Sequence, residues 1–377
     1  MLTPQEEQFY ARQTILPALG KVGQERLKSS KIAVVGAGGL GCPVLSYLAG
    51  AGVGQLTIID GDRVSESNLH RQLLFTMDDL EKSKAEVVKT RLLQSNPYIK
   101  VSLITEYLTP TNAESILKNH DLVIDCTDNY ATRYLINDVC FLLKKPMIYG
   151  AIHRFEGQIS VFNYKNGPTY RCLFPLVPSP ESQQNCAEAG VLGIIPGLIG
   201  ILQATEAIKI ITGIGEVLSG NVLFYNALNQ NFNKINLQRS SEETLLSYFN
   251  NGKLDPQLYK QNFCVSSSLE ITIDEIDFIK SNQYQWIDIR EIGEEPIVPE
   301  GLPIENIPLS EIMENLHLMD ENRIIILFCQ SGNRSLNAVE KLQKEGFINS
   351  KSLKEGISEK LITLWKQHLK FYSLKEQ

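Results

Sequence analysis

The stretch KIAVVGAGGLGCPVLSYLAGAGVGQLTIID, residues 31–60, decides the fold of the first part of this chain. It predicts a strand, a glycine-rich turn, a helix and a second strand, with Gly36, Gly38 and Gly41 in the spacing G-x-G-x-x-G. Glycines in such a turn let the backbone approach a phosphate closely, and the helix that follows presents free N–H groups to it. Asp60 ends the second strand, where a carboxylate can hydrogen-bond ribose hydroxyls. The pattern predicts a nucleotide-binding βαβ unit, and by itself it also fits a generic dinucleotide fold that binds NAD or FAD.

The composition is that of a globular chain with room for two domains, since 43% of its 377 residues are hydrophobic and 21% are charged. The net charge of −7 comes without a run of lysine or arginine, which argues against binding to nucleic acid or to an anionic membrane. The start, MLTPQEEQFY, lacks the features of a signal peptide, and the longest apolar run, 189–204, falls short of a spanning helix. We expect a cytoplasmic protein.

The cysteines argue against a disulfide scaffold and against a thiolate zinc site, because they are widely spaced and contain no C-x-x-C pair. We expect Cys42, Cys126, Cys140 and Cys264 to be small buried residues. The seven cysteines are Cys42, Cys126, Cys140, Cys172, Cys186, Cys264 and Cys329.

Polar side chains follow the second strand in the stretch DGDRVSESNLHRQLLF, where ligands bind in open α/β sheets. Asn68, Arg71 and Gln72 lie close together there, and Lys84 begins an amphipathic helix soon after. A hydride-transferring enzyme has no need of two such cations, whereas a triphosphate reacting at its α-phosphate does. The alternative is that Lys84 is a surface residue, although the first turn of a helix disfavours a cation.

Asp128 follows a further predicted parallel strand, DLVIDCTD, and is well placed to hold Mg²⁺ against a phosphate. Asn129 is a capping residue for the next helix. The alternative is that Asp128 itself is the helix N-cap, and the two roles can coexist.

A long loop, TYRCLFPLVPSPESQQNCAEAG, follows two more predicted strands and is long enough to suggest a function. It contains Cys172 and Cys186. A cysteine in a polar loop ahead of a helix can be exposed with a lowered pKa, so Cys186 is a candidate reactive thiol; otherwise it is an ordinary loop residue. The apolar run after the loop predicts a buried helix or helix pair, broken at Pro196 and Gly200.

From about Tyr10 to Gln238 the chain resembles the MoeB/ThiF family, the bacterial relatives of the ubiquitin-activating enzymes. The resemblance rests on GAGGLG, IDGD, SNLHRQ, Lys84, DCTDN and NCAEAG, in that order. It implies a Rossmann-like adenylation domain with a mostly parallel sheet, in which Asp128 binds the metal and Arg12 reaches into a partner subunit of a homodimer. The residues that it assigns to ATP and Mg²⁺ are Gly36, Gly38, Gly39, Gly41, Asp60, Ser67, Asn68, Leu69, His70, Arg71, Lys84, Asp128 and Asn129.

One departure concerns zinc. Many members of this family bind structural zinc through two C-x-x-C pairs, the first of which ends where Cys172 stands. Here Thr169 occupies the opening position of that pair, and no second pair follows Gly220. Zinc is therefore not supported, and we expect other packing to hold the loop.

After a domain at 1–240, we predict a polar linker at 241–265 and a smaller α/β domain at 266–377. A predicted strand, RIIILF, delivers Cys329 into the turn QSGNRS and then into a helix. Backbone N–H groups at such a turn lower the pKa of a thiol and suit an anion or a persulfide. The alternative is a cysteine simply buried at the end of a strand.

This second segment, about Ile271 to Leu369, resembles a rhodanese domain through Asp288-x-Arg290 and the CQSGNRS turn. The resemblance implies a persulfide on Cys329. Four residues separate Cys329 from Arg334, whereas the related phosphatase loops have five, which favours sulfur over phosphate. Two departures, Asn306 where the family often has histidine and the segment LKEGIS, put the specificity for the sulfur donor in doubt.

Together the two resemblances imply one pathway, in which ATP activates the C-terminal glycine of a ubiquitin-like sulfur carrier ending in Gly-Gly and sulfur from Cys329 converts it to a thiocarboxylate. Arg12, Arg71, Lys84 and Asp128 would serve the first reaction and Cys186 would resolve an acyl disulfide. A donor such as a cysteine desulfurase would load Cys329. The alternatives are a tRNA-modifying ATP-dependent dehydratase of the same fold, a non-catalytic scaffold for a ubiquitin-like protein, and an NAD oxidoreductase. The pathway served, whether molybdopterin, thiamin, tRNA thiolation or another, stays open.

Overall fold

The protein is described by a computed structural model of two compact units, Met1–Phe263 and Cys264–Gln377. The predicted linker, 241–265, contains a short helix, α11 (Glu242–Leu246), and the buried Tyr259, both in the first unit. The bounds of that linker stay a prediction. The structure describes residues 1–175, 190–249, 252–254, 259, 269–276, 284–299, 302–320, 323–347 and 349–372.

Within the described residues, the first unit contains an eight-stranded sheet in the order β3-β2-β1-β4-β5-β6-β7-β8. The first five of these strands are parallel and the last three pairings are antiparallel. The strands are β1 (Lys31–Val35), β2 (Gln55–Ile59), β3 (Lys100–Ile104), β4 (Leu122–Asp125), β5 (Met147–His153), β6 (Glu156–Phe162), β7 (Asn221–Asn226) and β8 (Asn231–Asn236).

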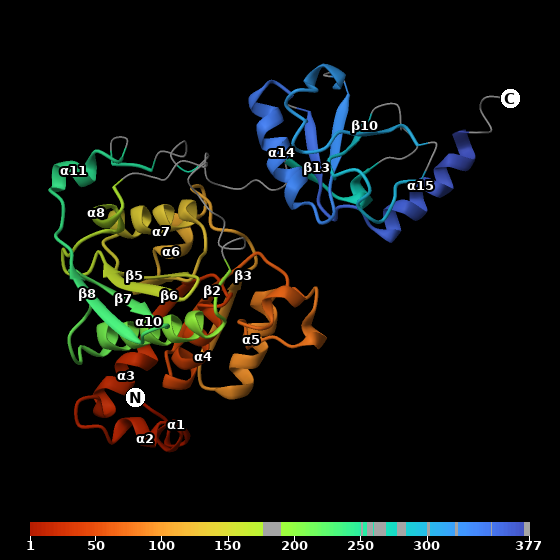
Figure 1. The fold of residues 1–377 in the computed structure, drawn as a ribbon. Coiled ribbons are helices and arrows are strands. Elements are labelled where there is room, and N and C mark those ends of the chain that lie inside the picture. The colour runs from red at the N-terminus through yellow and green to blue at the C-terminus, as the bar shows by residue number, and fades with distance from the viewer. Residues whose placement is uncertain are drawn as a thin grey trace. The chain divides into compact units, whose positions relative to one another are not determined.

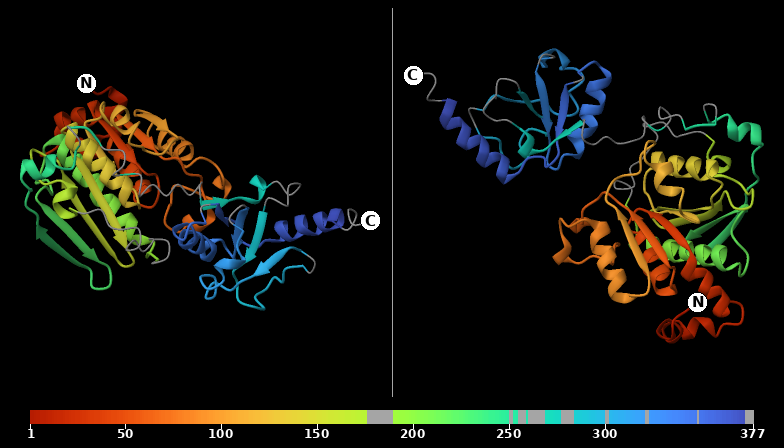
Figure 2. Two further views of the ribbon diagram at one scale, coloured as in Figure 1. Left: turned by 90° about the horizontal axis from the view of Figure 1, so that it is seen from above. Right: turned by 180° about the vertical axis from the view of Figure 1, so that it is seen from behind.

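Helices cover both faces of this sheet, and α7 and α10 lie on opposite sides of it (Figure 1). The view from behind in Figure 2 shows the same layering. This is the predicted doubly covered, Rossmann-like arrangement with a mostly parallel sheet. The helices are α1 (Pro4–Phe9), α2 (Ala11–Thr14), α3 (Gly20–Ser29), α4 (Gly41–Ala51), α5 (Lys84–Ser95), α6 (Ala113–Leu117), α7 (Tyr130–Leu142), α8 (Tyr170–Leu173) and α10 (Ile194–Thr212).

The strands build two cores because successive side chains of a strand point to opposite faces. In β1, Ile32 and Val34 join the hydrophobic cluster that includes residues of α4, α5 and α10. Ala33 and Val35 join the cluster that includes residues of α6 and α7. The run of apolar residues in KIAVV is therefore a strand buried on both faces, as a parallel sheet requires.

Helix α10 is continuous, so the expected break at Pro196 and Gly200 was wrong. Pro196 lies in the first turn, where its missing N–H removes no helical hydrogen bond. At Gly200 a Cβ would meet the carbonyl oxygen of Leu40, so glycine lets α10 cross α4 closely. By length and composition alone this helix of 19 residues, with a mean hydropathy of 1.6, could cross a membrane. In the structure it packs on α4, β5 and β6 as a core helix.

The described part of the second unit contains a five-stranded parallel sheet in the order β11-β10-β12-β13-β9. Cys329 directly follows β12, the central strand, as the sequence predicted. The elements of this unit are β9 (Glu270–Ile271), β10 (Tyr284–Asp288), β11 (Ile304–Asn306), β12 (Ile324–Phe328), β13 (Ser350–Leu353), α14 (Asn333–Lys344) and α15 (Glu359–Tyr372).

Candidate active sites

The glycine turn joins β1 to α4 at the point where the strand order of the first sheet reverses, which is where such sheets bind ligands. Gly36 has a φ of +95°, a conformation that other residues rarely adopt. A Cβ at Gly41 would overlap the carbonyl oxygen of Gly36, and one at Gly39 would press on Pro196 at 3.0 Å. The backbone therefore requires glycine at 36 and 41, whereas a Cβ at Gly38, the third glycine of the pattern, would make only an ordinary contact of 3.4 Å with Gln72.

A cavity of about 730 Å³ lies over this turn. Three of the predicted nucleotide-binding residues do not line the cavity. Gly41 packs on Gly36, Leu69 packs on the hydrophobic core, and Asn129 caps α7. The predicted residues that line the cavity are Gly36, Gly38, Gly39, Asp60, Ser67, Asn68, His70, Arg71, Lys84 and Asp128.

Asp60 directly follows β2 and hydrogen-bonds to the turn after β1, at the base of the cavity. Its Oδ2 accepts a hydrogen bond of 2.6 Å from the N–H of Ala37, and its Oδ1 accepts one of 2.8 Å from the N–H of Asp62. Burial raises the pKa of Asp60, against the opposing effects of the Ala37 N–H and Lys84. A carboxylate held in this way offers its remaining lone pairs in one direction, which suits the hydroxyls of a ribose.

Lys84 is the first residue of α5 and is only 5% exposed, which excludes the surface alternative. Its Nζ donates to Asp62 Oδ2 over 2.8 Å, and the hydroxyl of Tyr107 donates to Asp62 Oδ1 over 2.6 Å. Burial acts to raise the pKa of Asp62, but these two hydrogen bonds lower it below its ordinary value. Lys84 is therefore a buried ammonium beside the cavity with a carboxylate counter-charge.

Arg71 is the second cation at this cavity. Its Nη2 donates to Asn68 Oδ1 over 2.6 Å, and its Nη1 donates to the carbonyl of Ser67 over 3.1 Å. These bonds hold the guanidinium against its own turn and leave N–H donors for an anion. The predicted neighbours Asn68 and Arg71 are thus in direct contact.

Asp128 is exposed in the cavity and makes no hydrogen bond or ion pair with another described residue. Asn129, rather than Asp128, is the N-cap of α7, because its side chain accepts a 2.9 Å bond from the N–H of Thr132. The turn before it is held by Arg133, which donates from Nη2 to the carbonyl of Thr127 over 2.7 Å. Asp128 is therefore available to a cation or to a ligand.

Sequence reasoning missed several polar residues of the cavity, among them Asp62, Tyr107 and Arg133. Asp62 had a readable signal, because it lies two residues after Asp60 at the same strand end. Tyr107 follows β3 and Arg133 lies in α7, so neither carries a local signal, and only the fold brings them to the cavity.

Two further catalytic predictions in this unit stay open, because one residue is not among those that line the cavity and the other lies outside the described residues. Arg12 is exposed on α2 and does not line it. Cys186 falls in 176–189, outside the described residues. Their roles stay predictions.

Cys172 lies at the base of the crossover loop, half-buried. Its Sγ accepts hydrogen bonds of 3.3 Å from the N–H groups of Thr169 and Ser240. Burial acts to raise the pKa of this thiol, but the bonds from Ser240 and Thr169 lower it. No group of three metal-ligating side chains was found in a search of the described residues. That this protein does without zinc stays a prediction.

Cys329 is fully buried in the turn between β12 and α14. Burial acts to raise the pKa of its thiol, but hydrogen bonds from Ser335 and from the backbone of Ser331 and Arg334 lower it. Ser335 Oγ lies 3.5 Å from the sulfur. In contrast, Cys42, Cys126 and Cys140 are buried in the core, as predicted, and burial raises the pKa of each thiol. Cys264, the fourth cysteine of that prediction, lies outside the described residues. Cys329 differs from them because the turn supplies donors to the sulfur.

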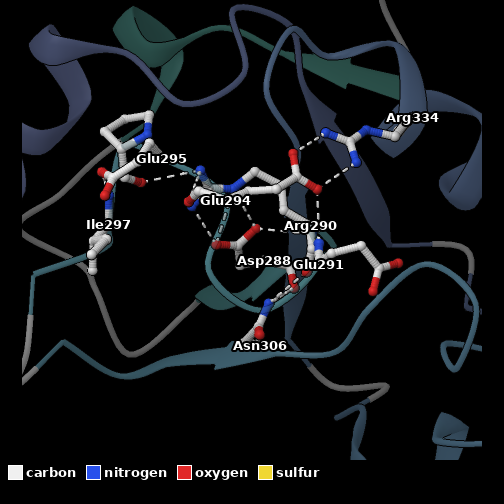
Figure 3. A network of polar contacts seen from close by, with 9 residues as sticks. Asp288, Arg290, Glu291, Glu294, Glu295, Ile297, Asn306 and Arg334 are labelled. Carbon is white, nitrogen blue, oxygen red and sulfur yellow. Dashed lines mark hydrogen bonds and ion pairs between the residues drawn. The ribbon is translucent and has the colours of Figure 1, made fainter.

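Asp288 and Arg290, the other motif of this unit, form a buried pair with Nη2–Oδ2 at 2.7 Å. Figure 3 shows the network around this pair, including Asn306, whose side chain donates to the carbonyls of Asp288 (2.9 Å) and Arg290 (3.0 Å). Asn306 thus holds the strand end at the position where the sequence departs from the rhodanese pattern.

Comparison with known proteins agrees with this geometry. Residues 10–246, more than half of the chain, match the ThiF family. The chain belongs to the ThiF family. Residues 276–361 of this ThiF-family protein match the rhodanese-like domain, so both predicted resemblances are confirmed.

Two of the relatives of this ThiF-family chain match it over most of its length, and a third matches it over less than two thirds. The chain is 38% identical over 364 residues to the adenylyltransferase and sulfurtransferase MOCS3 of Drosophila sechellia, covering 91% of this chain and 80% of that protein. It is 39% identical over 94% of its length to a probable adenylyltransferase/sulfurtransferase MoeZ of Mycobacterium tuberculosis, of which it covers 93%. A sulfur carrier protein adenylyltransferase of Thermus thermophilus is 49% identical over 63% of this chain and 90% of its own length.

Solved structures agree on the fold. MccB of E. coli, in a structure with ATP, superposes with a TM-score of 0.55 at 24% identity over 62% of this chain and 72% of that chain. With the relatives above, the two family matches establish an enzyme that joins an adenylyltransferase to a sulfurtransferase. The family is one of ATP-using adenylyltransferases.

Proposed function

We propose that the first unit transfers AMP from ATP·Mg²⁺ to the C-terminal glycine of a ubiquitin-like sulfur carrier protein ending in Gly-Gly, and that the second unit supplies sulfur for its thiocarboxylate. The observation that carries the proposal is one cavity in which Arg71, Lys84 and Asp128 meet the glycine turn. The name of the Thermus relative, a sulfur carrier protein adenylyltransferase, supports the substrate class.

The cavity residues fit ATP. The turn from Gly36 to Gly41 and the start of α4 suit phosphates, and Asp60 suits the ribose. Asp128, free of described partners, would hold Mg²⁺, which when bound offsets phosphate charge and that of the departing pyrophosphate. A carboxylate is a weak nucleophile, so catalysis consists of holding it in line with the α-phosphate while Arg71 and Lys84 stabilise negative charge. No general base is needed.

The sulfur steps follow on the activated carbonyl. The terminal sulfur of a Cys329 persulfide attacks the acyl adenylate and AMP leaves, which gives a carrier-CO-S-S-Cys329 acyl disulfide. The Cys186 thiolate then attacks the sulfur of Cys329 and releases the thiocarboxylate. The resulting Cys186–Cys329 disulfide is reopened by two external thiols, which supply two electrons and are themselves oxidised to a disulfide. Unchanged thiocarboxylate turnover in Cys186→Ala would remove Cys186 from this scheme.

The deciding experiment is carrier-dependent exchange of labelled pyrophosphate into ATP, with a panel of carriers ending in Gly-Gly. We expect exchange with one carrier, which names the pathway, and its loss in Asp128→Ala. Asp78→Ala is the matched control, since Asp78 is exposed and lies outside the cavity. If the protein binds ATP but shows exchange with no carrier of the panel, the proposal is contradicted, and the dehydratase or the scaffold is favoured.

We further propose a cytoplasmic homodimer in which Arg12 completes the partner subunit's site, with a donor such as a cysteine desulfurase loading Cys329. Arg12→Ala and Asp128→Ala variants, each inactive in exchange, should recover about a quarter of the activity when mixed, because half of the dimers then contain one intact site. If Arg12 served its own chain, mixing would restore nothing.

A further inference from the structure

A buried ion pair lies beneath the turn that carries Asp128. Asp125, the last residue of β4, is fully buried, and its Oδ2 lies 3.6 Å from Nε of Arg133. Arg133 is 7% exposed and lies in the first turn of α7, where it lines the cavity. Replacing a buried ion pair by apolar residues of similar volume is often neutral or even stabilising. Stability alone therefore does not account for this pair.

Both members of the pair hold the backbone between β4 and α7. Asp125 Oδ1 accepts a bond of 2.9 Å from the N–H of Thr127 and one of 2.6 Å from its hydroxyl. Arg133 Nη2 donates to the carbonyl of Thr127 over 2.7 Å. Thr127, the residue before Asp128, is thus bonded through its N–H, its hydroxyl and its carbonyl. The backbone that leads into Asp128 therefore has a set place.

Arg133 is fixed on its other side by aromatic rings. Its guanidinium carbon lies 5.4 Å from the ring centre of Tyr149 and 5.9 Å from that of Tyr130. Tyr149 belongs to β5 and is 1% exposed. An aromatic face attracts a guanidinium, and more strongly where water is excluded. The pair is therefore anchored in the packing between the sheet and α7.

The same turn is fixed against the glycine turn. The N–H of Cys126 donates over 2.9 Å to the carbonyl of Val35, the last residue of β1. A Cβ at Gly36 would come within 2.7 Å of the carbonyl oxygen of Cys126, so the two turns are in direct contact. From α10, the buried Gln203 donates to the carbonyl of Asp125 over 2.7 Å. The turn that carries Asp128 is thereby held next to the backbone that suits phosphates.

The charges of the pair suit a metal site because they cancel. An uncompensated guanidinium at the cavity wall would repel a divalent cation. With Asp125 opposite, Arg133 donates to the turn without adding net charge there. Groups that orient a metal ligand without binding the metal typically change metal affinity by about 10–100-fold when they are removed.

We propose that Asp125 and Arg133 are positioning residues for the metal site: this buried pair holds the turn 126–128 so that the Asp128 carboxylate can bind Mg²⁺ beside ATP. The pair acts through Thr127 and is assigned no contact with the metal. The inference rests on the proposed function, in which Asp128 binds the metal.

The test is calorimetric titration of the full chain with α,β-methylene-ATP, which cannot react at its α–β bond, in Mg²⁺ and in EDTA. The double variant Asp125→Asn/Arg133→Met removes both charges and the donor to Thr127 but keeps the net charge of the chain. We expect its Kd in Mg²⁺ to rise about tenfold or more and its Kd in EDTA to change less than about threefold, since only the metal complex needs Asp128. A pair that served folding alone would not act selectively on the Mg²⁺ complex.

The matched control is Asp138→Asn/Arg171→Met. It neutralises another buried pair, with Nη2–Oδ2 at 2.7 Å, whose aspartate lies on the same helix α7 and whose residues do not line the cavity. Its Kd in Mg²⁺ should be that of the wild type. Circular dichroism melts check the folding of each variant. If Asp125→Asn/Arg133→Met does not fold, Arg133→Lys takes its place. It keeps a charge opposite Asp125 but loses the planar fork of donors, and its Kd in Mg²⁺ should rise about threefold.

An unchanged Kd in Mg²⁺ for the pair variant, or an equal rise in the control, would overturn the proposal. Asp128→Ala separates that failure from failure of the proposed function, because it should lose the same Mg²⁺-dependent affinity. If Asp128→Ala bound the nucleotide in Mg²⁺ as tightly as the wild type, the metal role of Asp128 and this proposal would both be wrong.

Discussion

Lys84 Nζ lies 2.8 Å from Asp62 Oδ2, so the buried cation of the cavity has a carboxylate partner from the protein itself. Both residues line the cavity. A triphosphate brings negative charge to the same place and can share Lys84 with Asp62. We therefore expect the stability of this pair and the binding of ATP to be coupled.

Asp62→Asn should destabilise the first unit in the absence of nucleotide, because it leaves a 5% exposed ammonium without a counter-charge. We expect a loss of about 1–2 kcal/mol, less than for a fully buried pair because the Asp62 side chain is 46% exposed. ATP should restore more stability to the variant than to the wild type. Thermal melts followed by circular dichroism, with and without ATP·Mg²⁺, check this. An equal ATP-dependent shift in both proteins would contradict the coupling.

Gly41→Ala should abolish ATP binding, since the added Cβ would overlap the carbonyl oxygen of Gly36 and force the turn open. A shift of the backbone in a packed turn costs about 1–3 kcal/mol. Gly50→Ala on the same helix is the control, because a Cβ there has nothing within 4 Å. That control should be neutral or slightly stabilising, by about 0.5–1 kcal/mol. Isothermal titration with ATP distinguishes the two variants, and normal affinity in Gly41→Ala would show that the turn can relax.

Asp138→Ala should destabilise the first unit strongly. Asp138 on α7 accepts bonds of 2.8 and 2.7 Å from Arg171 and one of 2.6 Å from the hydroxyl of Tyr259, and it is fully buried. These contacts tie α8, at the base of the crossover loop, to α7 and to Tyr259, which lies beyond α11. Removing one partner of a buried pair costs about 3–5 kcal/mol.

Urea unfolding of the full chain can assign that loss to one unit. Both tryptophans, Trp286 and Trp365, lie in the second unit, so their fluorescence should report an unchanged transition while circular dichroism reports an earlier one. Glu242→Ala is the control, since Glu242 pairs with Arg239 at a side-chain exposure of 63% and should cost less than about 1 kcal/mol. A fluorescence transition that moved with Asp138→Ala would show that the two units unfold together.

Alkylation of Cys329 should proceed at a lower pH than that of an ordinary cysteine. Burial opposes the thiolate, but the donors of Ser335, Ser331 and Arg334 outweigh it and lower the pKa. A lowered pKa means that the reactive thiolate dominates from a lower pH upward, so the midpoint of the rate profile moves down. Iodoacetamide labelling with peptide mass spectrometry gives the profile for each cysteine.

Ser335→Ala should move that midpoint to a higher pH and slow labelling near neutral pH several-fold. The hydroxyl of Ser335 contributes more than the other donors to the lowered pKa of Cys329. Cys140 is the internal control, because it is as buried as Cys329 but has no hydrogen-bond donor that lowers its pKa, so its pKa is raised and it should stay unlabelled in the folded protein. A profile for Cys329 that matched a free thiol would contradict the role of the turn.

Much of the fold was predictable because its signals are local. The glycines of the turn, the apolar strand KIAVV and the carboxylate Asp60 all lie within residues 31–60. Steric contacts within that turn require glycine at 36 and 41. The order of elements around Cys329 was readable for the same reason. The break expected in α10 was wrong, because proline is tolerated in a first turn and Gly200 serves a helix crossing that no local pattern reveals.

The site was predictable only in part. Arg71, Lys84 and Asp128 could be found because polar residues after parallel strands gather at one edge of a sheet. Other residues of the cavity could not be found in this way. Tyr107 lies 45 positions from Asp62, to which it donates a hydrogen bond, and Arg133 comes from α7.

The sequence by itself therefore determined the two families, the phosphate-binding turn and the reactive thiol, because each depends on side chains that are neighbours along the chain. Only the tertiary structure decided which carboxylate pairs with each cation. It paired Lys84 with Asp62 and Arg334 with Glu294, the latter across 40 positions. Electrostatic partners are set by distance in space, and folding brings together residues whose separation in sequence carries no signal.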